Sequence, residues 1–164
     1  MDEIDRRIVE LLTENARISY KEIAGHVFLS STAVSARVEN LEKSGVISGY
    51  HAEINPLALG FYTKAFINVE IEPAQKQEFY PYIAGVAGVV ECNCVTGEYS
   101  MLIEVIFRTP MELDAFIGEL QRFGKTKTLI VFSTSVEHRN TFFTGDTNSN
   151  TTIKKPIDNR RGVL

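Results

Sequence analysis

Hydroxyl-bearing and basic side chains are concentrated between residues 17 and 43 of the sequence. Ser30, Ser31 and Thr32 are consecutive, and Ser35 and Arg37 follow within about two helical turns. Hydroxyl, guanidinium and ammonium groups donate hydrogen bonds to phosphates, and guanidinium groups also pair with guanine. This chemistry indicates contact with nucleic acid. The residues that we expect to contact DNA are Arg17, Lys21, Ser30, Ser31, Thr32, Ser35, Arg37 and Lys43.

Three short helices are predicted to position these side chains. Asp2 can cap a first helix, and Ser19 with Glu22 has the pattern of a capping box for a second helix. Ser30 or Ser31 caps a third helix, which ends near Gly45. Apolar residues at helical spacing give each helix one buried face. The expected core residues are Ile4, Ile8, Leu11, Leu12, Ile23, Ala24, Val27, Val34, Val38 and Leu41.

The connection between the second and third helices consists of Phe28, Leu29 and Ser30. Such a short turn between two short helices is typical of a helix-turn-helix motif, and we expect Phe28 and Leu29 to pack in the turn against the first helix. Residues 46–54 have a two-strand pattern that turns near Ser48 and Gly49. This pattern predicts a wing, so residues 1–54 are expected to form a winged helix-turn-helix DNA-binding domain.

The third helix of such a motif enters the major groove with its N-terminal residues near the base edges. On this helix, Arg37 is the best ligand for guanine or phosphate. Glu39 can accept a hydrogen bond from a cytosine amino group, but we favour the interpretation that it repels phosphate. The whole chain carries a net charge of −4, which also weakens the attraction to DNA. The sequence therefore predicts a modest salt dependence of DNA binding and a reliance on several weak sites of one oligomer.

Residues 62–140 have a different pattern, in which apolar and polar residues alternate as in half-buried strands. Strands are predicted at residues 65–71, 89–96, 101–107 and 128–136, with one helix after the first strand and one before the last. The order β-α-β-β-α-β indicates an α+β, ferredoxin-like domain with an antiparallel sheet. Its helices cover one face, while Ile106, Leu129 and Val131 make the other face too apolar for water. We therefore expect a partner subunit to cover that face.

A linker at residues 55–61 is expected to separate the two domains, beginning at Asn55 and Pro56. Residues 141–164 are a polar C-terminal tail with little to bury, and we expect this tail to be mobile. The basic residues near its end are interpreted as solvated charges rather than as an arm that touches DNA. The N-terminus lacks the apolar core of a signal peptide, and no apolar run approaches the roughly 20 residues of a membrane span. The sequence thus predicts a cytoplasmic protein without membrane contact.

Several stretches of the chain carry recognisable motifs. They are DRRI at residues 5–8, ARIS at 16–19, LSSTAVSARV at 29–38, LEKSGVISGY at 41–50 and VTGEY at 95–99. Over residues 1–139 the chain resembles the leucine-responsive/asparagine-responsive (Lrp/AsnC, feast/famine) family of transcription regulators. The resemblance implies a sequence-specific DNA-binding regulator whose C-terminal domains pair through their sheets into homodimers and then into larger rings such as octamers. It also implies that small effectors, usually amino acids, bind at interfaces between these domains and change assembly or DNA binding.

Within this resemblance, residues 95–99 border the effector pocket. Gly97 lets backbone N–H groups approach a ligand carboxylate, and Tyr99 can line the pocket. Relatives often carry an acidic residue where Ser100 stands, so its absence puts an ordinary α-amino acid in doubt unless Glu98 compensates. The alternative interpretation is a plain hairpin turn. The expected effector-binding residues are Thr96, Gly97, Glu98, Tyr99 and Ser100, with Thr128 and Thr134 supplying hydroxyls across an interface.

Two alternative functions stay open at this point. The acidic third helix is compatible with a ligand-binding regulatory module whose DNA binding is weak or lost. A tetrapyrrole-decarboxylase-like enzyme would need an Arg-rich wing and a His-containing second strand, and this sequence lacks both. His26, His51 and His138 are scattered, while Cys92 and Cys94 are interpreted as ordinary strand thiols. The sequence predicts no enzymatic activity, no metal and no cofactor other than a small-molecule effector.

Overall fold

The computed structural model describes residues 1–138, and these residues form two compact units, residues 1–53 and residues 54–136. The expected C-terminal tail at residues 141–164 lies outside the described residues. The second unit also includes the segment expected to be a linker, and this segment contains a short 3-10 helix, Leu57–Leu59. Arg108 holds it, because its guanidinium donates to the carbonyl of Leu59 and lies 4.7 Å from the ring centroid of Phe61.

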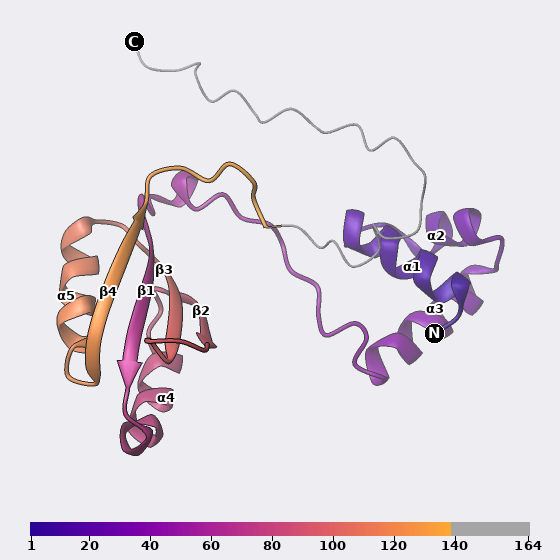
Figure 1. The fold of residues 1–164 in the computed structure, drawn as a ribbon. Coiled ribbons are helices and arrows are strands. Elements are labelled where there is room, and N and C mark those ends of the chain that lie inside the picture. Colours follow the sequence, from indigo (N-terminus) through magenta and orange to yellow (C-terminus); the bar gives the residue numbers. More distant parts are fainter. Residues whose placement is uncertain (139–164) are drawn as a thin grey trace, which may run out of the picture. The chain divides into compact units, whose positions relative to one another are not determined.

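The N-terminal unit consists of the helices α1 (Glu3–Glu14), α2 (Tyr20–Val27) and α3 (Ser31–Lys43) (Figure 1). Both predicted caps are present: Asp2 caps α1, and Ser19 and Glu22 form the capping box of α2. Of the two serines proposed for α3, Ser30 is the N-cap. The predicted apolar faces meet in one core. Its buried residues are Ile8, Leu11, Leu12, Ile23, Ala24, Val27, Val34, Val38 and Leu41, with Ile4 partly buried beside them.

The turn between α2 and α3 differs from the prediction at one residue. Leu29 packs against the core as expected, but the side chain of Phe28 is 93% exposed. The prediction that Phe28 packs in the turn is therefore wrong. Phe28 is the C-cap of α2 and has a left-handed backbone with φ of 55°, a conformation that ends the helix and turns the ring toward solvent.

The predicted hairpin at residues 46–54 is also wrong in detail, because the structure contains no strand in this segment. Ile47 packs against the helical core, and its backbone N–H donates to the carbonyl of Leu41. The phenol of Tyr50 donates to Glu42 Oε1 at 2.9 Å. An isolated two-stranded hairpin is marginal in water, whereas these contacts with the helices hold the segment without strand pairing.

The C-terminal unit has the predicted order β-α-β-β-α-β. The strands are β1 (Thr63–Ile71), β2 (Val89–Cys94), β3 (Met101–Phe107) and β4 (Gly124–Val131), and the main helices are α4 (Lys76–Ala84) and α5 (Pro110–Leu120); a second 3-10 helix, Pro73–Gln75, precedes α4. They form an antiparallel sheet in the order β2-β3-β1-β4. The last strand begins four residues before its predicted start and ends at Val131. Thr134 therefore lies outside the sheet.

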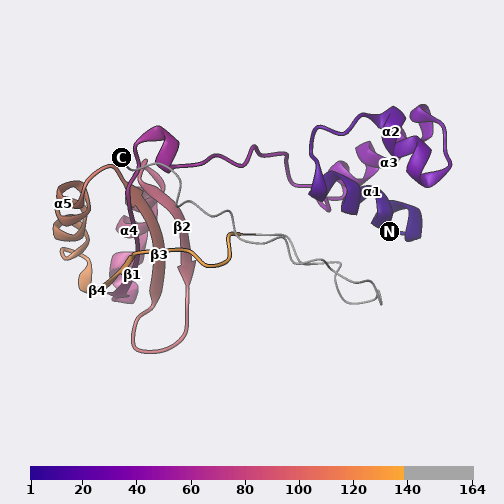
Figure 2. The same ribbon diagram turned by 90° about the horizontal axis from the view of Figure 1, so that it is seen from above.

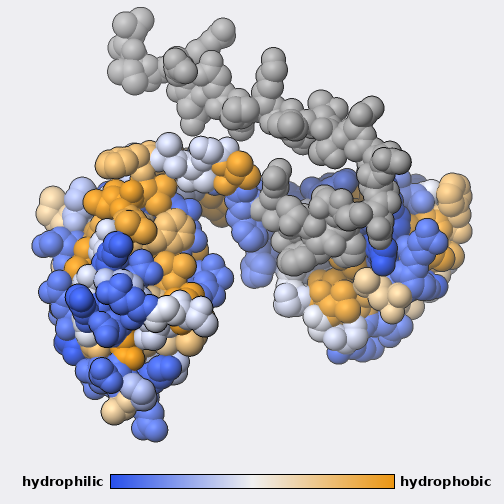
Figure 3. Space-filling model, viewed as in Figure 1, coloured by the Kyte–Doolittle hydropathy of each residue, from blue (hydrophilic) through white to orange (hydrophobic). Residues whose placement is uncertain are grey.

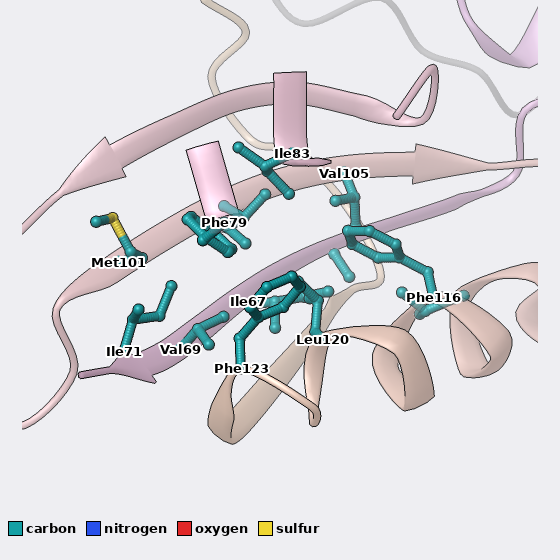
Figure 4. Packing of buried hydrophobic residues seen from close by; sticks show 13 residues of the cluster. Ile67, Val69, Ile71, Phe79, Ile83, Met101, Val105, Phe116, Leu120 and Phe123 are labelled. Carbon is teal, nitrogen blue, oxygen red and sulfur yellow. The ribbon is translucent and has the colours of Figure 1, made fainter. Parts of the chain in front are cut away.

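One face of the sheet packs against α4 and α5 around a single core (Figure 4). Alternate residues of β1 and β3 point into this core, where they meet Phe79 and Ile83 of α4 and Phe116 and Leu120 of α5. The rings of Phe79 and Phe123 contact each other edge to face, with centroids 5.4 Å apart. This packing confirms the period-two pattern on which the strand predictions depended.

The opposite face of the sheet carries a mixed apolar and charged surface. The strand register places Lys64 opposite both Ile106 and Val131, and Phe66 opposite Leu129. The three residues predicted to share the open face therefore do so. Lys64 Nζ lies 2.7 Å from Glu104 Oε1 near the middle of this face. Figure 3 shows apolar residues exposed among charged residues on the visible side of the C-terminal unit.

Candidate DNA-binding surface and ligand loop

The N-terminus of α3 presents hydroxyl groups and free backbone N–H groups to solvent. Ser30, Ser31 and Thr32 are exposed, and Ser35 is half-buried one turn later. Ser30 Oγ accepts a hydrogen bond from the backbone N–H of Ala33 at 3.2 Å, which leaves its hydroxyl proton available to an acceptor. Helix N-termini attract anions because the first N–H groups lack partners within the helix. This end of α3 can therefore bind a phosphate oxygen or a base edge.

Three of the four basic residues predicted to contact DNA are exposed. Arg17 lies between α1 and α2, and Lys21 is in the first turn of α2. Lys43 is in the last turn of α3, where its ammonium group is 3.7 Å from Glu39. Because both side chains of that pair are more than half exposed, the pair is weak and solvent screens it.

Arg37 has partners that sequence reasoning missed. Its Nη1 atom is 2.7 Å from Asp2 Oδ2 and 2.7 Å from Asp5 Oδ1, so it connects α3 with the N-terminus of α1. These hydrogen bonds raise the pKa of Arg37. The pKa of Asp2 is lowered, first by the hydrogen bond from the backbone N–H of Asp5 and then by Arg37. The signal in the sequence was the acidic pair Asp2 and Asp5 at the start of the first helix, of which Asp2 was interpreted as a cap and Asp5 only as part of a motif.

Negative charge surrounds the second half of α3. Glu39, Glu42 and the Asp2–Asp5 pair lie on or beside this helix. Between Met1 and Glu53 there are nine Asp or Glu residues and six Lys or Arg residues. The unit that should bind a polyanion is therefore acidic. Its attraction to DNA must come from a few well-placed donors rather than from its overall charge.

A shallow hollow lies beside the same part of α3 and was not predicted. The residues that line it are Met1, Asp5, Arg37, Asn40, Leu41, Ser44 and Val46. It contains the Arg37 ion pair and the start of the segment expected to form the wing.

The loop predicted to border an effector pocket joins β2 and β3 at the end of the sheet (Figure 2). Gly97 has φ of 116°, and no atom lies within 4 Å of the position that a Cβ would take. Thr96 and Glu98 are exposed, while Tyr99 is half-buried. The loop therefore presents backbone groups and a carboxylate to an open space.

The hydroxyl of Ser100 bonds to the backbone at the end of strand β1. Ser100 Oγ accepts a hydrogen bond from the backbone N–H of Ile71 at 2.9 Å, and the Ser100 N–H donates to the carbonyl of Val69 at 3.1 Å. These contacts fix the loop to the end of β1. Ser100 thus positions the loop, and the residues before it, Glu98 and Tyr99, are exposed and half-buried respectively.

Strand β4 brings a different residue to this loop from those predicted. Lys125 Nζ is 3.9 Å from Glu98 Oε1. Thr128 pairs with Ile67, so it lies on the face of the sheet that the helices cover, and Thr134 follows the end of β4. Lys125 was missed because the strand was predicted to start at Thr128.

Both cysteines of the chain lie in the C-terminal unit. Cys92 and Cys94 are free thiols on β2, and burial raises the pKa of Cys92. Within residues 1–138 no three His, Cys, Asp or Glu side chains are grouped so that they could hold a metal ion. In the same residues, no helix combines the length and apolar character needed to cross a bilayer.

The fold and its exposed α3 define a two-part transcription regulator, with a helix-turn-helix unit followed by a ligand-binding unit. The family model for winged helix-turn-helix DNA-binding domains matches residues 1–48, and the model for the Lrp/AsnC ligand-binding domain matches residues 64–141. The chain belongs to the Lrp/AsnC family of DNA-binding transcription regulators.

Similar proteins support this assignment over most of the chain. The HTH-type transcriptional regulator LrpA of Bacillus subtilis is 33% identical over 132 residues, which cover 80% of this chain and 97% of that protein. The feast or famine regulatory protein Rv3291c of M. tuberculosis, solved with L-methionine, has a TM-score of 0.79 and 30% identity over 85% of this chain and 97% of its own. AsnC of E. coli has a TM-score of 0.77 and 28% identity, with coverage of 85% and 97%.

Proposed function

We propose that this protein binds specific sites in double-stranded DNA through the N-terminus of α3. The observation that carries the proposal is the exposed cluster Ser30, Ser31 and Thr32 on a helix whose opposite side is locked in a core. In a helix-turn-helix motif, this end of the third helix reaches the base edges. Arg17 lies before α2 and Lys21 lies within it, where such motifs contact the DNA backbone.

Selection of duplexes from a random pool by the full-length protein tests this proposal. We expect the pool to converge on one motif, and Thr32→Ala to weaken binding to the selected duplex by about tenfold, which is the effect of losing one good base or phosphate contact. Thr13→Ala is the matched control, since Thr13 is exposed on α1 and its hydroxyl donates only to the carbonyl of Val9. A pool that does not converge at low salt would contradict the proposal.

We also propose that an amino acid is the effector and that it binds at the loop of residues 96–100. The complex of Rv3291c with L-methionine supports this chemistry. The ligand carboxylate would accept hydrogen bonds from backbone N–H groups near Gly97, and its ammonium group would pair with Glu98. Lys125 already contacts Glu98, so the ligand must displace this exposed ion pair, which costs little.

Calorimetric titration with each of the common amino acids tests the effector. For the amino acid that binds, Glu98→Gln should reduce affinity by about tenfold or more, since it removes the partner of the ammonium group. Glu91→Gln is the control, because Glu91 is an exposed carboxylate on neighbouring strand β2. If Glu98→Gln binds as tightly as the unchanged protein, the ammonium site is elsewhere.

We propose that two chains pair through the open face of the sheet into a homodimer and that such dimers build larger rings. We also propose that the protein acts in the cytoplasm. The exposed apolar residues of this face support the proposal because soluble monomers rarely leave such surfaces uncovered. Pairing would also place two DNA-binding units on one particle, which compensates for the acidity of each unit.

A second function has support from the charges around α3. Arg37 and Lys43 both have carboxylate partners, and the N-terminal unit is acidic. These features favour a ligand-binding regulatory module with weak DNA affinity. The duplex selection described above separates the two functions, since a module of this kind would enrich no motif but would still bind its effector.

A further inference from the structure

We infer that Arg37 is a positioning residue, which sets α3 against the N-terminus of α1 and makes no contact with DNA. This inference rests on the proposed DNA-binding function. It also reverses the role that the sequence suggests for Arg37, since an arginine on the third helix of a helix-turn-helix motif is ordinarily a phosphate or guanine ligand.

The geometry uses every carboxylate oxygen of Asp2 and Asp5. Asp2 Oδ1 accepts from the backbone N–H of Asp5 at 2.8 Å, and Asp5 Oδ2 accepts from the backbone N–H of Asp2 at 3.1 Å. The other oxygen of each carboxylate accepts from Arg37 Nη1. The capping box therefore fixes the orientation of both carboxylates, and Arg37 bonds to the oxygens that the box leaves free. Such a rigid acceptor pair holds Arg37 in one place.

The charge balance of this cluster also opposes a phosphate contact. Two carboxylates face one guanidinium, so the cluster has one excess negative charge. Asp5 is only 18% exposed and Arg37 is 31% exposed in their side chains. Both hydrogen bonds use Nη1, so a phosphate could be reached only through Nη2 or Nε, beside two carboxylates that repel an incoming anion. The ion pairs link residues more than thirty positions apart, and they lie next to the core contacts of Val34, Val38 and Leu41.

Two hypotheses now make opposite predictions for DNA binding. If Arg37 positions α3, its removal misplaces the Ser30–Thr32 cluster. The number of phosphates that the protein contacts, and with it the number of counterions released on binding, then stays the same. If Arg37 binds a phosphate, Asp2 and Asp5 compete with DNA for it, and their neutralisation should strengthen binding. The salt dependence separates the hypotheses, because each lost phosphate contact reduces the slope of log affinity against log salt by roughly 0.9.

The experiment measures the affinity of the full-length protein for its selected duplex at several salt concentrations. The variants are Arg37→Met, Arg17→Met, the pair Asp2→Asn with Asp5→Asn, and the pair Glu3→Gln with Glu14→Gln. Asparagine keeps the capping acceptors, so the Asp double variant should fold. The Glu double variant is its matched control, because it removes two exposed charges from α1 and leaves Arg37 paired.

We expect Arg37→Met to lose about three- to tenfold in affinity with an unchanged salt slope, whereas Arg17→Met lowers the slope by roughly 0.9. The Asp double variant should bind at least threefold more weakly than the Glu double variant. A lower slope for Arg37→Met, or tighter binding by the Asp double variant than by its control, would overturn the inference. If Arg37→Met does not fold, the comparison of the two double variants decides alone. A protein that selects no duplex contradicts the proposed function instead.

Discussion

Single residues show where local rules suffice and where they do not. The caps at Asp2 and Ser19 were predictable, and the third was narrowed to Ser30 or Ser31, because a cap involves neighbours three residues away. Arg37 was assigned another role because its partners are more than thirty residues away and nothing in the helix pattern indicates them. The predicted burial of Phe28 was wrong for a different reason. Hydrophobicity predicts that a side chain is buried, but it does not predict the backbone angle that directs the side chain.

Phe28→Gly should raise the free energy of unfolding of the N-terminal unit by up to about 1 kcal/mol. A left-handed backbone costs a residue with a Cβ roughly 1–2 kcal/mol, and glycine avoids most of this cost while having more freedom in the unfolded state. The ring is 93% exposed, so little packing is lost. Chemical denaturation measures the change. Phe28→Ala keeps the strain and should show no gain; a glycine variant less stable than the alanine variant would contradict the expectation.

Tyr50 should titrate far above an ordinary tyrosine. Burial, followed by its hydrogen bond to Glu42 and the charge of that carboxylate, raises the pKa of Tyr50 to about 12. A raised folded pKa leaves stability unchanged below pH 10 and lowers it as the pH rises from 10 toward 12, because the unfolded state ionises first.

Absorbance at alkaline pH checks this titration. Tyr50→Phe should remove the component with a pKa near 12, and Glu42→Gln should move that component to lower pH. An unaltered alkaline titration in the Tyr50→Phe variant would show that this phenol is not held as described.

At the scale of elements, the helices and most strands could be predicted because their apolar periods are clear. The errors are at element ends and in the strand pairing predicted for residues 46–54. Residues 46–54 have a strand pattern, but a hairpin also needs neighbours, and here Ile47 and Tyr50 contact the helices instead. Strand β4 starts at Gly124, and a glycine at this place in the sequence predicts a turn rather than a strand. Its φ is 155°, and a Cβ on it would overlap the carbonyl oxygen of Glu70.

Gly124→Ala should therefore destabilise the C-terminal unit by about 2 kcal/mol or more, since strand pairing at this point excludes any side chain. The measurement is thermal or chemical unfolding. Gly118→Ala provides the control of opposite sign: Gly118 lies within α5 with open space around it, so alanine should stabilise by about 1 kcal/mol. Equal effects of the two substitutions would contradict this account of β4.

At the scale of the whole molecule, the division into a helical unit and a βαββαβ unit followed from the change of period along the chain. The candidate site was less predictable. The loop of residues 95–99 was singled out from a motif, and its role as an effector site stays a prediction. Lys125 and the contacts of Ser100 could not be predicted, because they depend on how distant strands meet. The open face could be inferred in advance because alternation assigns every second residue of a strand to it.

Leu129→Lys should shift the protein from a dimer toward a monomer in light scattering. Leu129 is 51% exposed on the open face, next to Phe66, and a lysine there would bring a desolvated charge into the proposed interface. Met111→Lys is the control, because Met111 is 73% exposed on α5. Equal masses for the two variants, both dimeric, would place the subunit contact on another surface.

The strand order has a consequence for how the protein is made. β1 lies between β3 and β4, and both are synthesised after it, so this apolar strand leaves the ribosome with neither edge paired. The three helices before it pack around a core of their own and can fold as soon as they emerge. A growing chain thus passes through a stage in which the unit for reading DNA is complete while β1 is still open to unwanted association. Synthesis that stops after β1 and before β4 is complete would release a fragment in which the helical unit is folded. At least one edge of β1 in this fragment is unpaired and prone to aggregation.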